Sequence, residues 1–174
     1  MQATTQKYRK AIGDPLLIFF MALDGERGNI PGINRGRIAL LDDGGVIGRW
    51  VFSSSTAPKQ SVNDWNKIGG IMPPTTSMPG GRYWEFHTQR LIRPGMAVDD
   101  GFLITFDGNT EYTTIEGGTR SELFVHNDVN RVKAEGTFGC PFTFSDDEWQ
   151  DFCTGIFQSV SHKDTIRFAS LYCY

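Results

Sequence analysis

A cysteine and a histidine are the residues of this sequence best suited to covalent chemistry. His126 ends the apolar run 123–125, and Cys140 follows Gly139, with thirteen residues between histidine and cysteine. A thiolate attacks a carbonyl carbon far better than a thiol does, and an imidazole can take the thiol proton. Glycine before the nucleophile lets the backbone amides of Gly139 and Cys140 approach an oxyanion. The pattern predicts that His126 and Cys140 act as a base and a nucleophile.

A structural interpretation of the same two residues stays open. Cysteine is among the most frequently buried residue types, so Cys140 could be a buried thiol at a turn. His126 could be a histidine whose hydrogen bonds are satisfied at a strand end. The two interpretations differ in whether sulfur and imidazole meet in an accessible groove.

Other polar groups are weaker candidates. His87 is a rival base on an aromatic strand, and we interpret it as packed or surface-exposed. Cys153 lies beside Phe152 on an expected helix and is interpreted as core filler. Asn127 or Asp128 could orient His126, although both residue types are common at loop starts.

Composition limits the function classes. The 174 residues are 39% hydrophobic and 21% charged with a net charge of -3, as expected for one soluble globular domain. The absence of a basic block argues against nucleic-acid binding along a phosphate-tracking surface. The apolar run 16–23 is too short to span a membrane, and no cleavage pattern follows it, so we expect no signal peptide and synthesis in a cytoplasm.

The three cysteines, Cys140, Cys153 and Cys173, form neither a disulfide framework nor a zinc-binding spacing. We therefore expect no metal and no other cofactor.

Strand and turn signals dominate the chain. The runs 37–41 and 46–52 flank an Asp-Gly turn and predict a β-hairpin. Further strands are expected at 82–87, 102–106, 112–115, 120–126 and 165–172, and a proline-rich loop at 72–81. The fold class is mostly β (α+β): one β-sandwich or barrel-like domain over 1–174, with a segment of uncertain role at 1–36.

One amphipathic helix is expected at about 146–160. Ser145 and Glu148 fit a capping box, in which Ser145 accepts from the Glu148 amide and the Glu148 carboxylate reaches back. Trp149, Phe152, Ile156, Phe157 and Val160 fall on one face, which should lie on the sheet.

The order of these parts resembles the catalytic domain of the L,D-transpeptidases, cysteine enzymes that act on peptidoglycan stem peptides. The resemblance covers residues 36–145, and the matching parts are the hairpin at 37–54, the segment Pro79-Gly80-Gly81-Arg82-Tyr83, His126, and Thr137-Phe138-Gly139-Cys140. It implies a domain of that type in which Cys140 forms a thioester with a stem peptide and His126 moves the proton. Water or a second amine would then release the product, giving carboxypeptidase, endopeptidase or transpeptidase activity.

The chain also departs from that family. Phe138 stands where the family usually has a second histidine, and Phe142 and Phe144 stand where it has asparagine and arginine. The substrate carboxylate would then fall to Arg120 or Arg82.

The alternative function is a non-catalytic structural or cell-wall-binding component, such as a virion protein. Under the enzymatic interpretation the chain would be a phage lysin or an injected effector that reaches the cell wall by that route. The expected partners are stem peptides or other virion proteins, without nucleic acid and without a membrane span.

Overall fold

The described part of the chain consists of β-strands, one α-helix and two short 3-10 turns. The structure is a computed structural model that describes residues 7–22, 33–55, 72–94, 98–113, 119–121, 123–128 and 140–173. Its elements are β1 (Leu16–Ala22), β2 (Ile33–Asp42), β3 (Gly45–Ser55), β4 (Trp84–His87), β5 (Leu91–Ile92), β6 (Asp100–Thr105), β7 (Glu111–Thr113), β8 (Thr119–Ser121), β9 (Leu123–Asn127), β10 (Phe142–Thr143), α1 (Asp146–Val160) and β11 (Thr165–Cys173), with 3-10 turns at Thr75–Ser77 and Pro79–Gly81.

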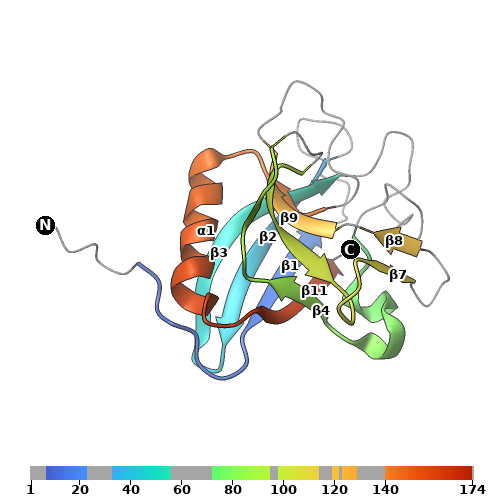
Figure 1. Ribbon diagram of the computed structural model, residues 1–174, viewed down its shortest axis with the longest axis horizontal. Helices are drawn as coiled ribbons and strands as arrows, with labels where there is room; N and C mark the ends of the chain where they lie inside the picture. Colours follow the sequence, from blue (N-terminus) through green and yellow to red (C-terminus); the bar gives the residue numbers. More distant parts are fainter. Residues whose placement is uncertain are drawn as a thin grey trace, which may run out of the picture.

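A ring of strands forms the body of the domain (Figure 1). The order is β4-β11-β1-β2-β3-β10-β9-β6, and β6 pairs with β4 to close the ring, while β5 continues from β6. β1 runs parallel to β11 and β10 parallel to β9, whereas the other neighbours in the ring are antiparallel. The expectation of a mostly-β domain with one helix is confirmed for the part of the chain that the structure describes.

The core lies inside the ring and under α1. Inward positions of β1, such as Leu17 and Phe19, are fully buried, whereas Phe20 between Phe19 and Met21 is exposed. The same alternation places Trp50 and Phe52 of β3 inside. Period-2 alternation of this kind gives each strand one buried face and one outer face.

The helix begins and ends where the sequence predicts, at Asp146 and Val160. The Ser145 side chain accepts from the Glu148 amide at 3.2 Å, as expected of an N-cap. The second half of the capping box is wrong, because the Glu148 carboxylate accepts from the Val51 amide, and the Ser145 amide donates to Thr143 Oγ1 at 3.2 Å.

The buried face of α1 also differs from the prediction at one position. Phe157 is 72% exposed. The buried face is centred on Phe152 and Ile156 and extends to Gly155 and Ser159, so Phe157 falls outside it.

The hairpin prediction is confirmed, with strands that extend beyond the predicted runs to Ile33 and Ser55. The expected strand at 120–126 is instead two strands, β8 and β9, in different sheets. A tight turn at 107–109 follows β6, since Asp107 and Gly108 both have positive φ and Phe106 pairs with Asn109. No helix in the described ranges is long and apolar enough to cross a membrane.

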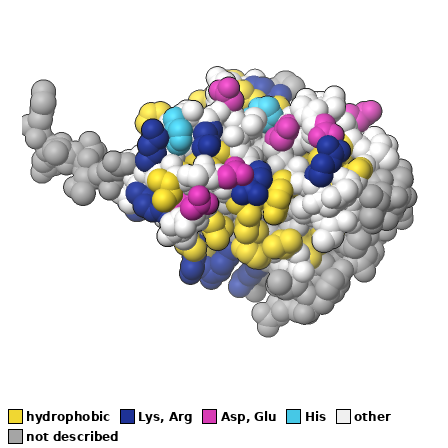
Figure 2. All heavy atoms as spheres, turned by 90° about the horizontal axis from the view of Figure 1, so that it is seen from below, with side chains coloured by type: hydrophobic (Ala, Val, Ile, Leu, Met, Phe, Trp, Pro, Cys, Tyr) yellow, Lys and Arg dark blue, Asp and Glu magenta, His cyan; other side chains and the backbone are white. Residues whose placement is uncertain are grey.

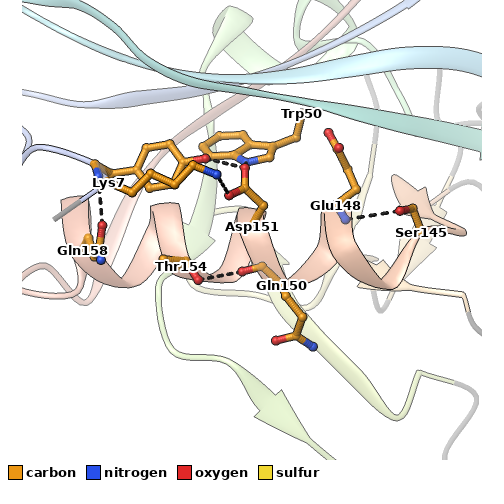
Figure 3. A network of polar contacts seen from close by, with 9 residues as sticks. Lys7, Trp50, Ser145, Glu148, Gln150, Asp151, Thr154 and Gln158 are labelled. Atoms are coloured by element: carbon orange, nitrogen blue, oxygen red, sulfur yellow. Dashed lines mark hydrogen bonds and ion pairs between the residues drawn. The ribbon is translucent and has the colours of Figure 1, made fainter. Parts of the chain in front are cut away.

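Residues from the N-terminal segment tie α1 to the ring (Figure 3). The Asp151 carboxylate accepts from the Tyr8 hydroxyl, from the Lys7 ammonium and, at 3.0 Å, from Trp50 Nε1. The Tyr8 amide donates to Gln158 Oε1 at 2.9 Å. One carboxylate therefore joins the segment before β1, the helix and β3.

We expect Asp151→Asn to lower the free energy of unfolding by about 1 kcal/mol, because the amide weakens the charge-assisted hydrogen bonds to Lys7 and Tyr8. Urea denaturation measures the change. Asp43→Asn, exposed in the β2–β3 turn, removes the same charge elsewhere and should leave stability within about 0.5 kcal/mol. Equal losses in both variants would contradict a specific role for Asp151.

Candidate functional site

Pairing between β9 and β10 brings Cys140 next to the strand that carries His126. Phe142 is the register partner of His126, and the His126 amide donates to the Pro141 carbonyl at 3.1 Å. Two residues earlier on each of these segments, Cys140 Sγ accepts a hydrogen bond from the Phe124 amide at 3.4 Å. Cys140, fourteen positions after His126 in the sequence, therefore lies just before the strand that pairs with β9.

His126 is held as a neutral imidazole. Its side chain is buried, and Nδ1 lies 3.0 Å from the Asn127 carbonyl, which can only accept, so Nδ1 carries the proton. Burial lowers the pKa of His126 to about 4, against the opposing effects of the Asn127 carbonyl, Asp99 and Asp100. Nε2 has no hydrogen-bond partner among the described residues.

No hydrogen bond joins Cys140 to His126 in the described structure, since Nδ1 is bonded to Asn127 and Nε2 has no partner. The Cys140 side chain is itself buried, with 6% of its surface exposed. Gly139, the expected oxyanion donor, lies outside the described residues, as do Thr137 and Phe138. The catalytic pair therefore stays a prediction.

The lowered pKa of His126 makes stability depend on pH. The unfolded imidazole titrates near its ordinary value of about 6.5 and the folded one near 4, so between these values the unfolded chain binds more protons. Stability should fall as the pH falls, by about 1 kcal/mol between pH 7 and pH 5.5 from this group. Urea denaturation at both values measures the loss, which His126→Gln should reduce and His162→Gln, at an exposed position, should not.

The two arginines predicted to hold a substrate carboxylate differ in what the structure describes of them. Arg82 Nη1 donates to Asp107 Oδ1 at 2.8 Å, and its guanidinium lies over the Phe106 ring. Arg120 is in β8, outside the main sheet, and its side chain is not among those the structure describes. Phe142 is fully buried and packs against His126 and Phe144, so it fills the position where a substrate-binding polar group was expected.

A groove opens in the gap between α1 and the paired strands β4 and β6. β4 and β6 share two register pairs, Glu85 with Thr105 and Phe86 with Ile104. Side chains of α1 face the gap, leaving a groove of about 790 Å³. Its lining includes His87, Gln89, Phe102, Gln150, Thr154 and Phe157. Histidine, charged and hydrophobic side chains are intermixed on the face seen from below, where α1 ends and β11 begins (Figure 2).

His87 is oriented by a chain of hydrogen bonds. The Thr105 hydroxyl donates its proton to Glu85 Oε2 at 2.8 Å. Thr105 Oγ1 can therefore only accept from His87, whose Nε2–H lies 2.9 Å away. Gly108 holds the carboxylate with its amide at 2.8 Å. In the neutral imidazole the proton then sits on Nε2, and Nδ1 is the atom left to accept from a ligand.

The wall of the groove next to β5 is rigid. Arg90 donates twice to Asp100, at 2.6 and 2.5 Å, and Trp149 Nε1 donates to the same carboxylate at 2.8 Å. Cys153 also lines the groove, but burial raises the pKa of its thiol to about 12, so the thiol stays protonated at neutral pH. This supports the prediction that Cys153 is core filler.

Sequence reasoning identified His87 but not the groove around it. The groove depends on how α1 packs beside β4 and β6, and no local pattern encodes that packing. The sequence placed Phe157 on the buried face of the helix, so its exposure beside the groove is found only in the structure. Comparison of the chain with protein-family models, with curated proteins and with solved structures finds no match in any of the three.

Proposed function

We propose that the chain is a non-catalytic binding domain that holds a short peptide of the peptidoglycan stem-peptide class in the groove beside α1. The observation that carries the proposal is a contrast in accessibility: the groove is open to solvent, whereas Cys140, the expected nucleophile, is buried. The resemblance to L,D-transpeptidases supplies the ligand class. In this proposal the chain keeps a domain of that type while phenylalanines occupy part of its former polar site.

The groove has the size and chemistry for such a ligand. Ligand pockets in proteins usually measure roughly 300 to 1,000 Å³ and combine apolar walls with a few well-placed polar groups. Gln150 and Thr154 of α1 offer amide and hydroxyl groups to a peptide backbone. Phe157 at the rim offers an apolar contact to a side chain or a methyl group.

Titration of the ¹⁵N-labelled protein with a purified stem tetrapeptide tests the proposal. We expect amide shifts confined to α1 and the ends of β4 and β6. Phe157→Ser should weaken binding about tenfold, because the aromatic contact that the bound peptide would cover is lost. Ile12→Ser is the matched control, since Ile12 is also exposed but lies before β1. No shift with the tetrapeptide, or equal weakening by both variants, would contradict the proposal.

Cysteine acyl transfer is the second candidate. The specific observation in its favour is that Nδ1 of His126 donates to the Asn127 carbonyl, which leaves Nε2, the nitrogen with the lone pair, without a partner among the described residues. In that mechanism Cys140 Sγ would attack the carbonyl before a D-amino acid, and His126 would take the thiol proton and give it to the leaving amine. Gly139 and Cys140 amides would hold the oxyanion, and Arg120 or Arg82 the substrate carboxylate.

Mass analysis of sacculi and stem peptides after incubation separates the two candidates. Product formed by the wild type and absent with Cys140→Ala would establish acyl transfer. Peptide binding without product in either protein would favour the binding domain. The same incubation with Cys153→Ala controls for the second buried thiol.

A further inference from the structure

Three arginines lie together on the outer face of the β2–β3 hairpin. The inward residues of these strands, such as Ile38 and Trp50, are buried, so the alternate residues Arg35, Arg37 and Arg49 point outward, and all three are exposed. In the register of the hairpin Arg37 lies opposite Val51 and Ala39 lies opposite Arg49. Arg49 is thus the diagonal neighbour of Arg37, and Arg35 is two residues along the same strand, each about 7 Å away.

These arginines have no ion-pair partner among the described residues. Several other arginines form ion pairs: Arg82 with Asp107, Arg90 with Asp100, and Arg167 with Asp14. Guanidinium groups without ion-pair partners, spaced along the outer face of a sheet, present a row of planar, bidentate donors. Charge complementarity therefore calls for a ligand with anionic groups repeated along a chain.

An aromatic ring borders the row on the same face. Phe20 of β1 is the register partner of Arg37, and its side chain is 37% exposed although it sits in the middle of a strand. Val51 flanks Arg37 on the other side and is 52% exposed. Exposed aromatic rings interleaved with arginines on a sheet are how single-stranded nucleic acids are held, with phosphates on the cations and bases on the rings.

From this arrangement we infer that the outer face of β1, β2 and β3 binds single-stranded nucleic acid, with Arg35, Arg37 and Arg49 on successive phosphates and a base on Phe20. The inference is independent of the groove and of the Cys140 site, which lie on other parts of the ring. It also differs from the expectation drawn from composition, because a net charge of -3 hides a local row of positive charge.

Fluorescence anisotropy of a labelled twelve-nucleotide oligothymidine tests the inference with the full chain. Three phosphate contacts predict a slope of log affinity against log salt of about -2. Replacing Arg35, Arg37 and Arg49 together by Gln should weaken binding at least tenfold at low salt and bring the slope close to zero. Phe20→Ala should weaken binding about fivefold and leave the slope unchanged, because stacking is not electrostatic.

A triple variant with the same loss of charge elsewhere, Lys10→Gln with Arg93→Gln and Lys163→Gln, is the matched control. It should keep the slope and lose less than about twofold in affinity. Equal weakening by both triple variants, no binding at low salt, or duplex DNA bound as tightly as the single strand with no effect of Phe20→Ala would each overturn the inference.

Discussion

Phe152→Ala is expected to lower the free energy of unfolding by about 3–5 kcal/mol, the largest effect of any single substitution considered for this protein. Phe152 is fully buried in the middle of α1. Its ring centroid lies 5.1 Å from that of Trp50, 5.0 Å from that of Phe52 and 5.6 Å from that of Phe102. The side chain is thus the contact through which the helix joins β3 on one side of the ring and β6 on the other.

Two contributions make the loss large. Truncation removes the transfer free energy of the ring, and it leaves a cavity that rigid aromatic neighbours on three strands and α1 cannot collapse to fill. Helix propensity works in the opposite direction, since alanine is the better helix former, but by less than 1 kcal/mol. Packing therefore decides the sign.

Urea denaturation followed by tryptophan fluorescence measures the change, provided that the slope against urea is the same in both proteins. Phe157→Ala is the matched control: it makes the same substitution on the same helix at a residue that is 72% exposed, and should change stability by less than about 0.5 kcal/mol. A loss below about 1 kcal/mol for Phe152→Ala, or equal losses for both, would show that α1 does not depend on this contact.

The contrast between Phe152 and Phe157 also shows what could be predicted from sequence. Local signals were sufficient for α1, because Ser145, the acidic first turn and the apolar periodicity lie within sixteen residues of one another. They were sufficient for the β2–β3 hairpin for the same reason. Which edge of the apolar face is buried could not be predicted, since it depends on where β3 lies against the helix.

Glu148 shows the same limit at the level of one hydrogen bond. The capping box assigns its carboxylate to the Ser145 amide, but that amide is already satisfied by Thr143 Oγ1, and the Val51 amide of β3 takes the carboxylate. A local motif was correct about the helix start and wrong about the partner. The competing donor came from a residue about one hundred positions away in the chain.

The candidate sites depended still more on tertiary pairing. Sequence spacing suggested that Cys140 and His126 could meet, and the parallel pairing of β10 with β9 places Cys140, which precedes β10, beside the strand of His126. The same pairing buries both side chains, which no spacing rule could indicate. The arginine row was hidden for a related reason: Arg49 joins Arg35 and Arg37 only through the register of the hairpin.

Gly155→Ala is expected to lower the free energy of unfolding by about 2 kcal/mol, although the same substitution stabilises most helix interiors by about 1 kcal/mol. A Cβ at Gly155 would lie 2.4 Å from Trp50 Cζ2 and 3.0 Å from Cη2. The indole cannot move away, because its other side packs closely against the backbone of Gly48 in β3 and its Nε1–H donates to Asp151 at 3.0 Å. The clash therefore outweighs the gain in helix propensity.

A double-mutant cycle with Trp50→Phe isolates the clash. Phenylalanine lacks the part of the indole that the new methyl group would meet, so in the Trp50→Phe background Gly155→Ala should be neutral or stabilise the protein by up to about 1 kcal/mol. The coupling free energy between the two sites is then about 2–3 kcal/mol, measured by urea denaturation of the four proteins. If Gly155→Ala destabilises both backgrounds equally, Trp50 is not the obstacle, and the glycine is required for a reason other than the close approach of α1 to β3.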